Sequence, residues 1–84
     1  MSTSQHQLTD VAEALRVAGG LTHQQFVDAL SRDKTEWAHM RARRRGPSDA
    51  FVRALRTYAH TVGGIWPSRV DVAIQQDALA KVAA

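Results

Sequence analysis

The chain has 84 residues, of which 44% are hydrophobic, enough for one domain with a small core. It contains no cysteine, which excludes a disulfide framework and a thiolate metal site. No stretch approaches the roughly 20 apolar residues that span a bilayer. The polar first seven residues lack the apolar run of a secretory signal peptide. We therefore expect a cytoplasmic protein with no membrane partner.

The net charge of +3 is concentrated in the middle third of the chain. Residues 31–60 hold eight Lys or Arg and three Asp or Glu, whereas the flanking segments have net charges of −2 and 0. Four of the arginines fall within five positions: Arg41, Arg43, Arg44 and Arg45. This concentration favours a surface that faces a polyanion, with a merely solvated face as the alternative.

Hydrophobic periodicity predicts an all-α fold, a compact bundle of about five helices, because no stretch alternates as a strand does. After a disordered tail over residues 1–7, a helix is expected to begin near Thr9 or Asp10. Glu13 stands in capping-box spacing with Asp10, and Gly19-Gly20 ends the helix. Its apolar stripe comprises Leu8, Val11, Leu15 and Ala18.

The next two helices have the strongest local signals in the chain. Thr22 and Gln25 form a Thr-x-x-Gln capping box, and Asp33 is a suitable N-cap for the helix after it. A turn over residues 31–33 separates the two helices. The inward residues of the first are Phe26, Ala29 and Leu30.

The helix that follows Asp33 is expected to have two unlike sides. Trp37 and Met40 are three residues apart and should face the core, so Trp37 is assigned to the core rather than to base stacking. The opposite side carries small and polar residues, as a recognition helix requires: Lys34, Thr35, Ala38 and His39.

Two further helices complete the predicted bundle. Gly46-Pro47 breaks the chain, Ser48 caps the fourth helix and Gly63-Gly64 ends it. Its buried face comprises Phe51, Val52, Leu55, Tyr58 and Ala59. The fifth helix is expected to begin near Pro67 or Ser68. This predicts a helix-turn-helix domain over residues 8–62 and a C-terminal helix over residues 63–84.

The C-terminal helix carries an apolar stripe that needs a partner. The stripe comprises Trp66, Val70, Ile74, Ala78 and Val82. We expect it to form a two-fold homodimer, because the first four helices are enough to close a small core. The alternative is that the stripe packs back on the bundle.

The middle of the chain resembles the lambda-repressor-like helix-turn-helix family of phage repressors, Cro-type proteins and antitoxins. The matching segments run from Leu21 through Leu30, from Asp33 through Met40 and from Arg43 through Tyr58. The resemblance covers residues 8–60. Three positions depart from the family pattern. Ser31 stands where glycine is usual, at a cost of the order of 1 kcal/mol for a left-handed backbone. Arg32 replaces an apolar residue, and Arg41 replaces a glutamate.

The resemblance implies that the helix from Asp33 to about Ala42 enters the major groove of DNA. Lys34, Thr35 and His39 would then contact base edges, with Ala38 small enough for close approach. The implied phosphate contacts are Thr22, His23, Arg41, Arg43, Arg44 and Arg45. Glu36 either completes the cap at Asp33 or accepts from a cytosine. Arg53 and Arg56 are assigned to solvated helix surface.

These observations predict a sequence-specific regulator of transcription, a small phage or mobile-element repressor of the Cro-like kind. It would bind a palindromic double-stranded DNA operator as a homodimer. The alternatives are an antitoxin that represses its own promoter and an interaction module for an acidic protein. We expect no catalytic residues, metal site, cofactor or small-molecule ligand, since the four histidines lack metal spacing and no nucleophile elbow or phosphate loop occurs.

Overall fold

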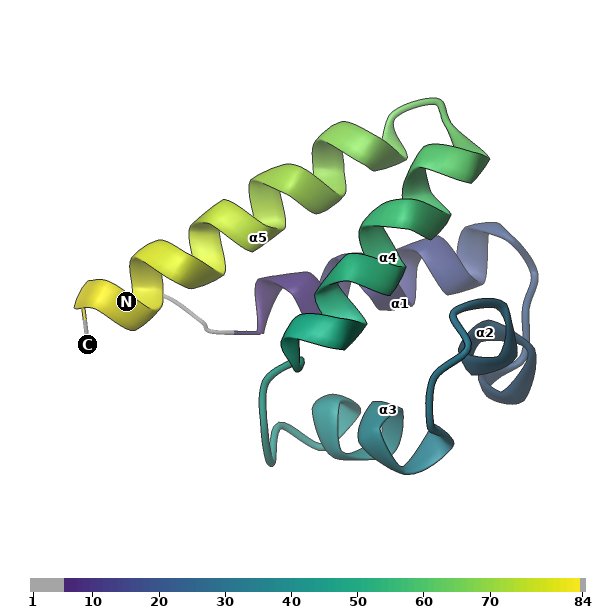
Figure 1. The fold of residues 1–84 in the computed structure, drawn as a ribbon, viewed down its shortest axis with the longest axis horizontal. Helices are drawn as coiled ribbons and strands as arrows, with labels where there is room; N and C mark the ends of the chain where they lie inside the picture. The colour runs from purple at the N-terminus through teal and green to yellow at the C-terminus, as the bar shows by residue number, and fades with distance from the viewer. Residues whose placement is uncertain (1–5, 84) are drawn as a thin grey trace.

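A computed structural model describes residues 6–83, which form five α-helices and no strand (Figure 1). The predicted all-α bundle is confirmed. The expected tail over residues 1–7 lies mostly outside the described part of the chain, although Gln7 already belongs to the first helix. The helices are α1 (Gln7–Ala18), α2 (His23–Ala29), α3 (Lys34–Arg41), α4 (Asp49–Val62) and α5 (Trp66–Ala83).

Three aromatic residues form the centre of the core. Trp37 stacks on Phe51 with ring centroids 5.9 Å apart and an angle of 9° between the ring planes. The ring centroids of Phe26 and Trp37 are 5.1 Å apart, and all three side chains are fully buried. Residues from all five helices surround them, including Leu8, Leu15, Met40, Leu55 and Val70.

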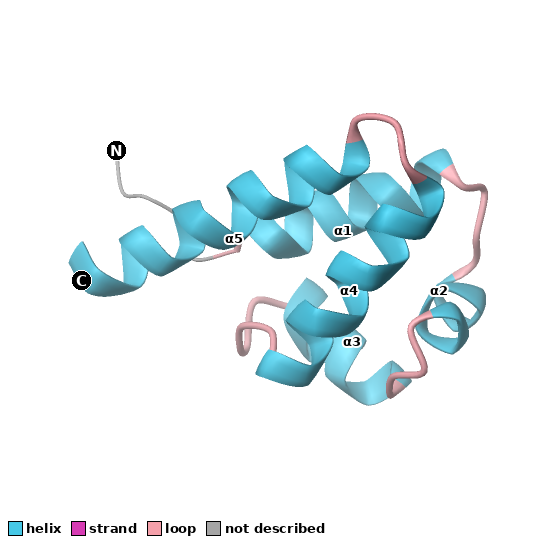
Figure 2. Ribbon diagram, turned by 45° about the horizontal axis from the view of Figure 1, so that its top comes forward, coloured by secondary structure: helices cyan, strands magenta, loops and turns pink. Residues whose placement is uncertain are grey.

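The elements are arranged with α3 and α5 on opposite sides of the molecule. Figures 1 and 2 show α5 lying across α1 and α4, while α3 lies on the far side of α4. The most extensive helix contacts are those of α5 with α1 and α4. The outer surface of α3 is therefore not covered by the C-terminal helix.

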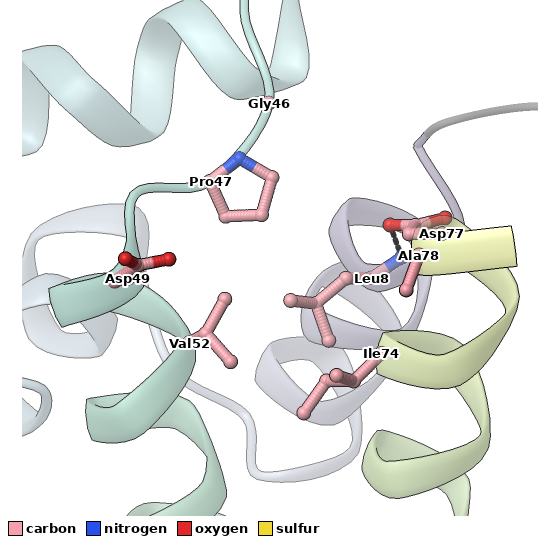
Figure 3. A pocket seen from close by; sticks show the side chains of 8 residues that line it. All are labelled: Leu8, Gly46, Pro47, Asp49, Val52, Ile74, Asp77 and Ala78. Carbon is pink, nitrogen blue, oxygen red and sulfur yellow. Dashed lines mark hydrogen bonds between the residues drawn. The ribbon is translucent and has the colours of Figure 1, made fainter. Parts of the chain in front are cut away.

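The start of α1 differs from the prediction. The expected capping box of Asp10 and Glu13 is wrong, because the helix begins at Gln7 and its N-cap, His6, makes no side-chain capping bond. Instead the Asp77 carboxylate of α5 accepts hydrogen bonds from the backbone N–H of Gln7 (2.9 Å) and of Leu8 (3.0 Å); Figure 3 shows the bond to Leu8. A residue from the last helix thus satisfies the first turn of α1.

A left-handed residue ends α2 and begins the turn to α3. Ser31 adopts a left-handed backbone with φ of 54°. Its N–H donates to the carbonyl of Asp28, and the N–H of Arg32 donates to that of Val27, the two bonds of a Schellman motif. The Thr22–Gln25 capping box is confirmed at the other end of α2. On that helix Phe26 and Leu30 are buried as predicted, whereas Ala29 is exposed and Val27 is buried in addition.

The same motif ends α3 inside the arginine run. Arg43 has φ of 61°, its N–H donates to the Met40 carbonyl, and the N–H of Arg44 donates to that of His39. The chain then turns to Ser48, whose hydroxyl oxygen accepts from Phe51 N–H and caps α4 as predicted. The arginines after Arg41 therefore lie on a tight turn and not on a helical extension.

The stripe proposed for dimerisation is divided between the core and the surface. Val70 is fully buried, so it cannot face a partner as expected, and Trp66 and Ile74 are partly buried against the core. Ala78 and Val82 are exposed. The hydrophobic core extends to α5, which contributes Val70 and Ala73 and packs against both α1 and α4. Ala18, expected on the inner stripe of α1, is also exposed.

Candidate DNA-binding surface

Helix α3 presents a polar outer side because its apolar side is anchored in the core. Trp37 and Met40 have no exposed surface, which fixes the rotation of the helix. Lys34, Thr35 and Ala38 are all exposed on the opposite side. The structure therefore brings three of the four predicted base-contacting residues to one accessible helical face.

His39 lies at the edge of this face. Its side chain is half-buried, and together with Ala38, Ala42 and two arginines it lines a shallow surface hollow. The arginines are Arg41 and Arg44. Two small alanines and two cations around one hollow form a surface that a phosphate group can approach.

Trp37 is held by α2 as well as by its aromatic neighbours. Its indole N–H donates to Nδ1 of His23 at 3.0 Å. In a neutral imidazole with Nδ1 as the acceptor, the proton is on Nε2, which remains the donor of the ring. Burial and the nearby charges of Arg41 and Arg16 lower the pKa of His23, so the neutral form is favoured.

The two residues predicted as phosphate contacts at the start of α2 thus differ in their surroundings. Thr22 is exposed, and its hydroxyl oxygen accepts the capping bond from Gln25 N–H, which leaves the hydroxyl proton available. His23 already has a structural partner at Nδ1, and only Nε2–H is left for an anion. The sequence did not indicate the bond between His23 and Trp37, since the two residues are 14 positions apart.

The arginine run makes several contacts within the protein. Arg43 pairs with Asp10 of α1, both side chains being about half exposed. Arg45 reaches Glu36 at 3.3 Å. Arg44 is exposed and makes no ion pair with any residue from 6 to 83. Arg41 lies over the indole of Trp37, with its guanidinium carbon 5.8 Å from the ring centroid.

Glu36 has a structural role that neither predicted reading anticipated. Its side chain is 6% exposed, so it cannot reach a cytosine. Its carboxylate does not complete the cap at Asp33 and instead binds Arg32 and Ser48. Oε1 accepts from Arg32 at 2.9 Å, and Oε2 accepts from the Ser48 hydroxyl at 2.6 Å. The sequence feature that could have indicated this ion pair is Arg32, four residues before Glu36, at a position where the family resemblance leads one to expect an apolar residue.

The electrostatics of Glu36 follow from these partners. Burial alone would raise the pKa of its carboxyl group, but the hydrogen bonds from Ser48 and Arg32 outweigh it and the pKa is lowered. The ionised carboxylate therefore joins the turn before α3 to the N-cap of α4. Asp33 meanwhile caps α3 by accepting from Thr35 N–H at 2.9 Å, without a capping box.

Another depression lies away from α3. It opens between the starts of α1 and α4 and the later turns of α5, as Figure 3 shows. Leu8, Val52 and Ile74 supply apolar walls, and Asp49 and Asp77 supply carboxylates. The Asp77 carboxylate is already occupied by the backbone N–H groups of Gln7 and Leu8 in α1.

Searches of protein-family models, of curated proteins and of solved structures found no match to this chain. Within residues 6–83, no three His, Asp or Glu side chains are placed to share a metal ion. None of the helices in the same range has the length and apolarity needed to traverse a bilayer. The outer side of α3 and its arginine turn remain the most distinctive polar surface in the described chain.

Proposed function

We propose that the protein binds double-stranded DNA in a sequence-specific manner and represses transcription by occupying its operator. The observation that carries this proposal is the placement of α3. Trp37 and Met40 are buried completely, and Lys34, Thr35 and Ala38 are exposed together on the other side. A short helix with small and polar residues on its free side fits the major groove, which is about 12 Å wide.

In the proposed complex, the first turns of α3 contact base edges. Lys34 donates to guanine O6 or N7, and Thr35 contacts a base or a thymine methyl group. Ala38, one turn later, allows the helix to lie close to the bases. Each specific contact contributes roughly 1–3 kcal/mol of discrimination between base pairs.

The arginine turn supplies affinity rather than specificity. Arg41 and Arg44 line the hollow beside His39 and have exposed guanidinium groups that suit phosphate oxygens. Thr22 and the Nε2–H of His23 provide further donors from the start of α2. The proposed phosphate contacts thus come from the start of α2, from the end of α3 and from the turn after it.

The resemblance of residues 8–60 to lambda-repressor-like proteins supports the same proposal, because Ser31 takes the left-handed conformation that the family turn needs. Repression by occupancy is the simplest mode of action for a domain of this size, since a bound protein excludes other proteins from its site. We propose a small repressor of the Cro-like kind on these grounds.

The experiment is a selection of bound duplexes from a random library, followed by salt titration of the selected sequence. We expect a defined sequence motif and an affinity that falls steeply with salt, because several phosphates are neutralised. Lys34→Ala should relax the motif, whereas Arg53→Ala, an exposed arginine on α4, should leave it unchanged. Enrichment of no motif, with equal affinity for duplex DNA and heparin, would refute sequence-specific binding.

A further inference from the structure

The outer side of α5 is apolar and uncovered in the single chain. Six large hydrophobic side chains are exposed among the described residues, and four of them lie on or next to α5. We call these four the outer stripe: Ile65 (62% exposed), Val72 (50%), Leu79 (62%) and Val82 (85%). The inner side of the same helix is buried through Val70 and Ala73. A helix with apolar residues on two sides needs cover on both.

The spacing of the outer stripe is that of a helix pair. Ile65, Val72 and Leu79 are seven residues apart, and Val82 follows three residues after the last of them. This is the a and d pattern of a coiled coil, with Ser68 and Gln75 at the intervening d positions. Ile65 lies in the turn just before α5, and the other positions of the pattern lie within the helix, which begins at Trp66 and ends at Ala83.

Two charged residues beside the outer stripe, Arg69 and Asp71, are engaged within the protein. Asp71 pairs with Arg56 of α4 at 3.1 Å, and the guanidinium of Arg69 lies over the ring of Trp66, 5.0 Å from its centroid. No charged residue occupies an a or d position of the stripe. Its occupant is therefore a neutral, apolar surface rather than a strongly charged partner.

A hollow adjoins the outer stripe, and an apolar side chain of a partner can enter it. It lies between α1 and α5, is open to solvent, and is lined by Val11, Ser68, Val72, Ala73 and Gln76 among others. Ser68 and Val72 belong to the a and d positions of the pattern. A leucine opposite Ser68 would enter this hollow.

We propose that the outer stripe binds the same stripe of a second copy of this chain, with the two α5 helices antiparallel. In the register with its two-fold axis between residues 73 and 74, Ile65 faces Val82 of the second copy. Ser68 then faces Leu79, and Val72 faces Gln75. Each Leu79 enters the hollow beside Ser68 of the other copy, so large residues meet small ones at both ends. A parallel pair would place Ser68 against Ser68 and leave the hollow empty.

The proposed interface is separate from the DNA-binding surface, and its test needs no DNA. The contact is isologous, so a two-fold axis would relate the two copies of α3. Because α3 lies on the opposite side of the molecule from α5, this interface leaves the outer side of each α3 uncovered. Failure of the interface would leave a DNA-binding monomer, which keeps the two proposals separable.

The experiment is analytical ultracentrifugation of the full chain without DNA, over a wide range of concentration. We expect a reversible dimer, and Leu79→Glu should raise the dissociation constant at least tenfold while circular dichroism stays unchanged. Val17→Glu is the matched control, since Val17 is equally exposed at 60% but lies at the end of α1. A wild-type chain that stays monomeric at all concentrations would overturn the proposal, and so would a dimer indifferent to Leu79→Glu.

Cysteine cross-linking tests the direction of the two helices, since the natural chain has no cysteine. The variant with both Ile65→Cys and Val82→Cys should form a covalent dimer on mild oxidation. The two positions are about 25 Å apart along one helix, too far for a bond within the chain. Val82→Cys alone should form no covalent dimer on oxidation. Efficient cross-linking of that single variant would indicate a parallel pair and refute the proposed register.

Discussion

Replacing Glu36 with glutamine tests whether the buried carboxylate fixes α3 against the start of α4. The carboxylate is 6% exposed and accepts hydrogen bonds from Arg32, Arg45 and Ser48. Glutamine keeps the shape but has one acceptor oxygen and no charge. Loss of a buried partner costs roughly 1–3 kcal/mol, and the exposed portions of both arginines limit the penalty because water can rehydrate them.

We expect Glu36→Gln to lower the free energy of unfolding by about 2 kcal/mol, which corresponds to a fall in Tm of roughly 8–16 °C for a domain of this size. Because the pKa of Glu36 is lowered in the folded state, its contribution is complete above the ordinary glutamate pKa and is lost as the pH falls through the folded value. The variant should therefore lose less stability than the wild type in acid.

The assay is thermal and urea unfolding followed by circular dichroism at neutral pH and at several acidic values. Asp71→Asn is the matched control, since its ion pair with Arg56 joins two side chains that are about half exposed. That change should alter the free energy of unfolding by no more than about 0.5 kcal/mol. Equal effects of the two substitutions, or an unchanged acid profile in Glu36→Gln, would refute the role assigned to the buried carboxylate.

Three further predictions follow from single contacts. Because the pKa of His23 is lowered in the folded state, its contribution to stability is complete above the ordinary histidine pKa near 6.5 and declines as the pH falls below that value. His23→Gln should flatten this decline in thermal melts, and an undiminished decline would contradict the role of His23. Asp10→Asn should free Arg43 for phosphate and steepen the slope of log affinity against log salt by about 0.9, whereas an unchanged slope would leave Arg43 outside the interface. Ser31→Gly should stabilise the protein by up to about 1 kcal/mol in urea unfolding, because Ser31 has φ of 54°, and a loss of stability would argue against strain there.

Local signals in the sequence were sufficient for most of the fold. The caps at Thr22, Asp33 and Ser48 lie where their spacing predicts, because each depends on residues within one helical turn. The inward placement of Trp37 and Met40 also follows from helical periodicity alone. These features are local, and tertiary packing did not reverse them.

Contacts between distant segments were not predictable in the same way. Asp77 caps α1 from 70 residues away, and nothing near Gln7 indicates it. Helix α5 has apolar residues on two sides, so periodicity could not tell which side meets the bundle; Val70 proved to be inside and Leu79 outside. The candidate site shows both cases, since Lys34 was placed correctly from local pattern while the partners of Glu36 depended on the folded turn.

The most direct test of α3 as the DNA-reading element is competition between the selected duplex and random-sequence duplex at fixed salt. Wild-type protein should prefer the selected duplex by at least a thousandfold. The variant carrying both Lys34→Ala and Thr35→Ala should retain its fold and its affinity for random duplex while losing most of that preference. A double variant that discriminates as well as the wild type would show that another surface reads the sequence.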